Sequence, residues 1–259
     1  MLDEFGISQK FHCFVGDNAT SNDGELIRNL NLHPNVNIDL NNRIRCAGHI
    51  INLVVKATLY GNGVSKWEEE LAQSAPKEQH KLWRKLGVVG KLHNFVNAVC
   101  ASHKRRELFE MVQEESHTEE LLHFNTLQLR QDGGIRWNSV YLMLLRCWEL
   151  RASIRAFVHQ LKTLDHDVDD DDDAQYDPLT DGLAETDWDD VKELIDFLVV
   201  PYEMTKRLEG NNSGNGFGSL WQTLVNLQAL WVSYSEAKER THNEFLSNAI
   251  TLGFEKLNT

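Results

Sequence analysis

Apolar and polar positions alternate over residues 11–15, which predicts a β-strand near the start of the chain. Phe11, Cys13 and Val15 fall on one face, and His12 and Phe14 fall on the other. Because the second face is mixed rather than polar, we expect both faces of the strand to be covered by other parts of the protein.

Asp17 follows this strand at the start of a polar turn. Gly16 ends the apolar run, and small or polar residues continue as far as Asp23, where the spacing changes to that of a helix. Open α/β sheets commonly carry their functional side chains at the carboxyl ends of strands, so Asp17 is a candidate catalytic carboxylate. The alternative is that Asp17 only caps the helix or forms the turn.

The remaining pattern is mostly helical. A second short strand is predicted at 43–46 and a buried helix at 47–59, and the apolar spacing of three and four residues recurs beyond Gly63. Further helices are predicted at 65–73, 77–112, 138–162, 188–208, 218–238 and 243–256. The sequence therefore predicts an α+β protein dominated by helices, with a partial α/β core over residues 1–62 and an all-helical domain over residues 63–259.

The net charge of −13 is concentrated in one segment. Residues 164–190 contain thirteen acidic residues and no Lys or Arg, and the rest of the chain sums to zero. The unbroken aspartates at 169–173 repel one another and cannot join a core, so residues from about 164 to 187 are predicted to form a disordered, solvated loop. Because the acidity is local, it does not argue against binding of nucleic acid elsewhere.

The composition predicts an intracellular protein. No apolar run approaches the roughly 20 residues that a membrane-spanning helix needs, and the first residues lack the pattern of a secretory signal. The four cysteines are widely and irregularly spaced, which is typical of reduced thiols.

One helical segment, residues 77–106, is basic. It contains eight Lys or Arg residues against the single acid Glu78, and it ends in the cluster Lys104, Arg105 and Arg106. Such a segment can neutralise DNA phosphates, with an affinity that falls as salt rises. Alternatively, it is a solvated face that balances the acidic loop.

Two pairs of residues are candidates for a more specific role. Cys46 and His49 lie three residues apart at the entry to a helix, as in half of a zinc site, although no second pair follows to complete four ligands. Arg136 and Trp137 follow a glycine turn, where the arginine could bind phosphate and the indole could stack on a base. In each case the alternative is ordinary packing.

Three runs in this order resemble the hAT family (hobo/Ac/Tam3-like) of DNA transposases. They are residues 16–23 (GDNATSND), 45–53 (RCAGHIINL) and 136–144 (RWNSVYLML). The resemblance implies a ribonuclease-H-like core interrupted by a long helical insertion, a nuclear location, oligomerisation, and cut-and-paste transposition of DNA. It also implies two divalent ions, Mg²⁺ or Mn²⁺, held by two aspartates and a glutamate.

The resemblance also implies roles for individual residues. Asp17 matches the second, metal-binding aspartate, and Cys46 and His49 match a supporting Cys-x-x-His motif near the active site. Arg136 and Trp137 match an Arg-Trp pair that contacts DNA, in which the indole can stabilise a flipped base.

The first aspartate, the final glutamate, the N-terminal zinc-binding domain and the C-terminal dimerisation segment of the family have no counterpart in this sequence. We therefore expect a remnant truncated at both ends that binds DNA without independent catalysis. The alternative is a domesticated, non-enzymatic scaffold that binds other proteins.

Overall fold

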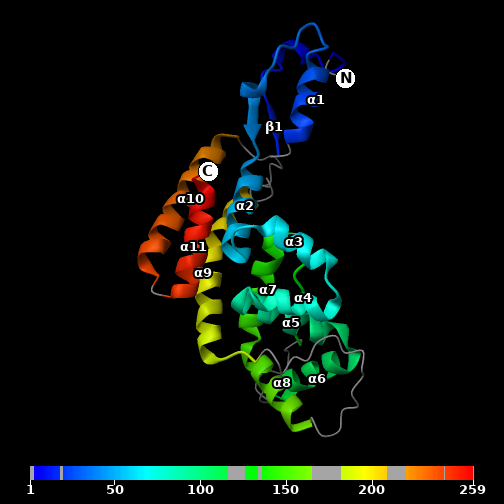
Figure 1. The fold of residues 1–259 in the computed structure, drawn as a ribbon, viewed down its shortest axis with the longest axis vertical. Helices are drawn as coiled ribbons and strands as arrows, with labels where there is room; N and C mark the ends of the chain where they lie inside the picture. Colours follow the sequence, from blue (N-terminus) through cyan, green and yellow to red (C-terminus); the bar gives the residue numbers. More distant parts are fainter. Residues whose placement is uncertain are drawn as a thin grey trace. The chain divides into compact units, whose positions relative to one another are not determined.

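The computed structural model describes residues 3–17, 20–115, 126–133, 136–164, 182–208, 220–241 and 243–258 of the chain (Figure 1). The helix-dominated fold class is confirmed: helices α1–α11 account for most of the described residues, and the strands β1 and β2 form one small sheet. The chain divides into two compact units. One comprises Met1–Leu53 with Thr205–Gln228, and the other Val54–Met204 with Ala229–Thr259.

The first unit contains the sheet. Strands β1 (Phe14–Gly16) and β2 (Arg43–Arg45) are parallel, with Phe14 opposite Arg43 and Gly16 opposite Arg45. Helix α1 (Thr20–Leu30) lies between them in the chain, and two short 3₁₀ helices, η1 (Ser8–Lys10) and η2 (Leu40–Asn42), precede the strands. Asp39 caps η2 by accepting a hydrogen bond from the backbone N–H of Asn41.

The first strand is shorter and more exposed than the alternation predicted. It begins at Phe14 rather than at residue 11, and the side chain of Val15 is 59% exposed. The prediction that both faces are covered is therefore wrong for Val15. Among the described residues β1 pairs with β2 alone, and so small a sheet does not establish a ribonuclease-H-like core, which stays a prediction.

Helical spacing located the helices well but not their breaks. The observed helices after β2 are α2 (Ala47–Tyr60), α3 (Val64–Gln73), α4 (Pro76–Arg84), α5 (Gly87–Ala101), α6 (His103–Glu115), α7 (Trp137–Glu149), α8 (Arg151–Leu164), α9 (Glu185–Leu208), α10 (Leu220–Arg240) and α11 (Glu244–Leu257). The predicted helix 77–112 is three helices. It breaks at Gly87, whose φ of +59° leaves the helical region, and at Ser102, which is extended.

Helix α5 lies at the centre of the second unit and packs against α4, α6 and α7. Its side chains Leu92, Phe95 and Val96 are at most 1% exposed. The rings of Phe95 and Phe109 both meet Phe157 edge-on, with centroids 5.9 and 5.5 Å apart, which joins α5 and α6 to α8. This aromatic contact holds the core of the helical region.

A second part of the same unit packs around Tyr234 of α10. Its ring lies 4.8 Å from that of Phe197 on α9, and its hydroxyl is hydrogen-bonded to Thr58 of α2 at 2.8 Å. A Cβ atom at Gly253 of α11 would lie 2.1 Å from the Thr58 hydroxyl oxygen, so only glycine fits there. In Figure 1, α9 (yellow), α10 (orange) and α11 (red) run side by side.

Most of the predicted acidic loop lies outside the described residues, including the aspartates at 169–173. Helix α9 already begins at Glu185, so the last residues assigned to the loop are helical. Within the described part of the chain, none of the helices has the length and apolar character needed to span a membrane.

Candidate functional site

The parallel register brings the candidate residues Asp17, Cys46 and His49 into one region of the first unit. Gly16 pairs with Arg45, so Asp17 and Cys46 are the first residues beyond the ends of neighbouring strands. The N–H of Cys46 donates to the carbonyl of Gly16 at 2.9 Å. The carbonyl of Cys46 then accepts from the N–H of Ile50 at 3.1 Å, which starts α2 and places His49 in its first turn.

An ion pair that the sequence did not reveal supports this turn. Arg43 Nη1 lies 2.9 Å from Asp23 Oδ2, and the two side chains are only 11% and 8% exposed. The Arg43 guanidinium also donates to the backbone carbonyl of Asp17. Arg43 and Asp23 are twenty residues apart in the sequence, so local spacing could not predict this contact. It depends on the pairing of β1 with β2.

The carboxylates in the described part of the chain do not form a two-metal site. Asp17 is exposed, and Asp23 is engaged by Arg43. Within the described ranges, no three His, Cys, Asp or Glu side chains come together in a way that could hold a metal ion. Metal binding, which the family resemblance implies, therefore stays a prediction. The described residues do not by themselves form a site for two ions.

Two of the predicted DNA-binding arginines cap a helix. Arg105 Nη1 donates to the carbonyl of Ala98 at 3.3 Å, and Arg106 donates to the carbonyl of Cys100, so both guanidinium groups fold back over the last turn of α5. The break at Ser102 turns α6 so that its first residues meet these carbonyls, where a cation is also favoured by the helix dipole. Lys104, between Ser102 and the arginines, is exposed.

Arg136 and Trp137 have different environments although they are adjacent. Arg136 is exposed at the N-cap of α7. Trp137 is 2% exposed, with its ring 6.4 Å from and perpendicular to that of Tyr202. In this conformation the indole packs in the core and cannot stack on a base.

The exposed cations of the basic segment are concentrated on α4. Lys77, Lys81 and Lys85 are all exposed and follow one another at intervals of four residues, which places them on one side of the helix and its C-cap. Lys81 is also paired with Glu78, with its Nζ 2.7 Å from Oε1, and both side chains remain exposed. Lys91, outside α4, is tied to Asp187, with Nζ 2.9 Å from both carboxylate oxygens. We define Lys77, Lys81 and Lys85 as the α4 lysine face.

A family model described as the ZBED1 RNase-like helical domain matches residues 44–197 of the chain. The match covers more than half of the sequence. The chain belongs to this family. The family is related to the hAT group, so the coarser part of the resemblance is confirmed, whereas the transposase itself stays a prediction. No curated protein and no solved structure matches.

Within this ZBED1-type helical domain, a partly buried chain of polar side chains links α5 to Asp132. His93 Nδ1 lies 2.7 Å from Asp132 Oδ1, and its Nε2 accepts from the Asn97 amide at 2.8 Å. The imidazole stacks on Trp83, with the ring centroids 3.5 Å apart. Local spacing could not reveal this network, because Asp132 lies 39 residues from His93.

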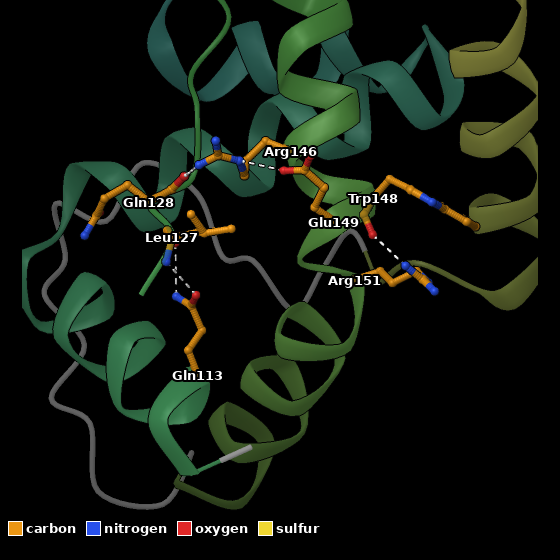
Figure 2. A network of polar contacts seen from close by, with 7 residues as sticks. All are labelled: Gln113, Leu127, Gln128, Arg146, Trp148, Glu149 and Arg151. Carbon is orange, nitrogen blue, oxygen red and sulfur yellow. Dashed lines mark hydrogen bonds and ion pairs between the residues drawn. The ribbon is translucent and has the colours of Figure 1, made fainter. Parts of the chain in front are cut away.

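Residues 126–133 have no regular secondary structure, and this segment is held from both sides at Leu127 and Gln128, as Figure 2 shows. Gln113 of α6 exchanges two hydrogen bonds with the backbone of Leu127, at 3.0 and 3.1 Å. Arg146 of α7 donates to the carbonyl of Gln128 at 2.8 Å and to Glu149 at 3.0 Å. These bonds satisfy backbone groups that have no strand partner.

Proposed function

We propose that this member of the hAT-related family binds DNA without catalysing transposition by itself. The observation that carries the proposal is the α4 lysine face, a row of three exposed cations on the same helical domain that the family model matches. Phosphate contacts of this kind supply affinity without sequence preference. Lys104 and Arg136, which are also exposed, add to the cationic surface.

The proposal assigns different roles to the other residues expected at the interface. Arg105 and Arg106 hold the end of α5, and Trp137 packs against Tyr202, so these three side chains act through the structure of the domain. Substituting them weakens DNA binding only as far as it disturbs folding.

We propose that the chain has no independent catalysis because too few carboxylates are available as metal ligands. Phosphoryl transfer by two metals needs several carboxylate ligands around both ions. Asp17 is the one residue that the resemblance matches to the catalytic carboxylates, and Asp23, in the same motif, is paired with Arg43. We expect no nicking of duplex DNA in Mg²⁺ or Mn²⁺. Nicking that Asp17→Ala abolishes would contradict this part of the proposal.

DNA binding is tested by fluorescence anisotropy with a labelled 20-base-pair duplex at several salt concentrations. For Lys77→Ala/Lys81→Ala/Lys85→Ala we expect about tenfold weaker binding at low salt. The slope of log affinity against log salt concentration should also decrease in magnitude, by about 2 to 3. The matched control is Lys10→Ala/Lys162→Ala/Lys238→Ala, which removes the same charge from three exposed but scattered positions.

Equal losses in the two triple variants would mean that net charge, not the α4 lysine face, governs the affinity. Binding that is absent at low salt, or that does not depend on salt, would favour the second candidate function, a protein-interaction scaffold. The large apolar side chains left exposed, such as Leu32 and Leu224, support that alternative.

A further inference from the structure

Two exposed arginines, one turn apart on α8, each lie against a tryptophan. The guanidinium carbon of Arg151 lies 4.4 Å from the ring centroid of Trp148, and that of Arg155 lies 5.9 Å from the ring centroid of Trp188. The two indoles are neighbours, with their centroids 6.4 Å apart. A cation at such a distance is attracted to the face of an aromatic ring. We define Arg151 and Arg155 as the α8 arginine pair.

Arg151 is held in position while it stays open to solvent. Its Nη1 donates to the backbone carbonyl of Trp148 at 2.9 Å, as Figure 2 shows. A guanidinium has five N–H groups in its plane, so stacking through its face leaves most of them for other acceptors. Arg146, at the end of α7, is by contrast bound to Glu149 and to the carbonyl of Gln128. Arg151 is therefore the arginine of this network that is prepared to bind an anion.

Arg155 already binds a carboxylate, which shows the kind of ligand that it accepts. Its Nη2 lies 2.5 Å from Oε2 of Glu185, and the two side chains are 45% and 78% exposed. Ion pairs this exposed contribute little free energy, so a phosphate can replace the carboxylate at small cost. Trp188 is 2% exposed and belongs to the core, so the aromatic surface beside Arg155 does not depend on Glu185.

The charge and spacing of α8 suit the backbone of DNA. Residues 151–164 contain no Asp or Glu. Arg151 and Arg155 are four residues apart, about 6 Å along the helix axis, and therefore emerge on the same side. Each strand of a duplex carries one phosphate for about every 3.4 Å of its axis, so both arginines can contact phosphates of one backbone. Lys162 lies about three turns beyond Arg151 and is not part of the pair.

We propose that the α8 arginine pair is a second surface that contacts the phosphates of duplex DNA, in addition to the α4 lysine face. The inference rests on the proposed function. Both helices belong to the second unit, so a single unit presents both surfaces. The contact depends on charge and on paired hydrogen bonds rather than on a large apolar area. Because the guanidinium of Arg151 is already positioned, less side-chain entropy is lost on binding.

Fluorescence anisotropy with a labelled 20-base-pair duplex at several salt concentrations tests the proposal. Arg151→Gln/Arg155→Gln should weaken binding by about fivefold to tenfold at low salt. The slope of log affinity against log salt concentration should decrease in magnitude by about 2, because two phosphate contacts are lost. The matched control is Arg28→Gln/Arg207→Gln, which removes two exposed arginines from the first unit. This control should keep the wild-type affinity within about twofold, since distant charges are screened.

A charge-preserving variant tests the role of the stacked guanidinium groups. Arg151→Lys/Arg155→Lys should restore the salt slope but only part of the affinity, because lysine lacks the planar, paired donors. Wild-type affinity in this variant would overturn the proposal, and so would equal losses in Arg151→Gln/Arg155→Gln and its control. Displacement of the DNA by an oligoglutamate peptide as effectively as by unlabelled duplex would overturn it in favour of an acidic protein partner.

The same measurements separate this inference from the proposed function. A wild-type chain that does not bind DNA in a salt-dependent way would overturn both. Binding that is weakened by Lys77→Ala/Lys81→Ala/Lys85→Ala but not by Arg151→Gln/Arg155→Gln would overturn the inference alone. Circular dichroism of each variant verifies that the helical content is retained.

Discussion

At the scale of single residues, burial decides which candidate side chains are available for chemistry. Neighbouring positions differ sharply, as with exposed Arg136 beside buried Trp137. The cysteines show the same contrast, because Cys13 is exposed and Cys147 is 0% exposed. Residue type and spacing singled out Arg136 and Trp137 and predicted reduced thiols, but neither property reports exposure.

Thiol labelling should reflect this difference. Burial raises the pKa of the Cys147 thiol, so at pH 8 it stays protonated and unreactive, whereas Cys13 is open to solvent. With a disulfide reagent under native conditions, we expect rapid modification that Cys13→Ser removes. Cys147 should react only in denaturant, and its rapid labelling in the folded protein would contradict the burial described for it.

Substitutions at the adjacent residues Trp137 and Arg136 allow a matched comparison of their effects on the free energy of unfolding. Trp137→Ala should lower the free energy of unfolding by about 3 to 5 kcal/mol, because it leaves a cavity beside Tyr202. Arg136→Ala, at the next and exposed position, should change it by less than about 0.5 kcal/mol. Urea denaturation measures both. A small loss for Trp137→Ala would mean that the indole is not held in the core.

At the scale of elements, close approach and backbone clamps decide how the helices are placed. The central case is the α4–α5 pair, where a Cβ atom at Gly90 would lie 1.7 Å from the carbonyl oxygen of Trp83. A second case is the segment that contains Leu127, whose backbone is held by the Gln113 side chain.

Gly90→Ala should therefore destabilise the second unit by about 1 to 3 kcal/mol, since α4 must move away from α5. Gly24→Ala is the control: Gly24 is also helical, and nothing lies within 4 Å of its added Cβ atom. That change should be neutral or stabilise α1 by up to about 1 kcal/mol. Thermal unfolding of both variants compares the effects, and equal outcomes would refute the tight contact at Gly90.

Gln113→Leu should release the segment that contains Leu127. The N–H of Leu127 loses its acceptor, so its hydrogen exchange should accelerate by about tenfold, which corresponds to a net bond of about 1 to 1.5 kcal/mol. Gln128→Ala is the control, because the backbone carbonyl that Arg146 binds is kept. Hydrogen exchange followed by NMR separates the two variants, and unchanged exchange at Leu127 would exclude the clamp.

At the scale of the whole molecule, the net charge of −13 opposes the approach of DNA, although the α4 lysine face is cationic. Replacing the five aspartates at 169–173 with asparagine changes the net charge to −8. We expect faster DNA association at low salt, with the difference disappearing above about 0.3 M salt as charges are screened. Stopped-flow anisotropy measures the rates, and a difference that persists at high salt would point to a cause other than long-range repulsion.

The sequence by itself determined the helix-dominated fold, because apolar spacing of three and four residues records which face of a helix is buried. It also determined the family resemblance, through three ordered motifs, and the start of α2 directly after a strand. The tertiary structure decided everything that depends on residues distant in the chain. The pairing of β1 with β2 joined Arg43 to Asp23 and left Val15 exposed, and the break at Ser102 turned Arg105 and Arg106 toward the end of α5. Local patterns encode which side chains prefer burial, but only the packed chain determines which of them find a partner and which remain open to solvent.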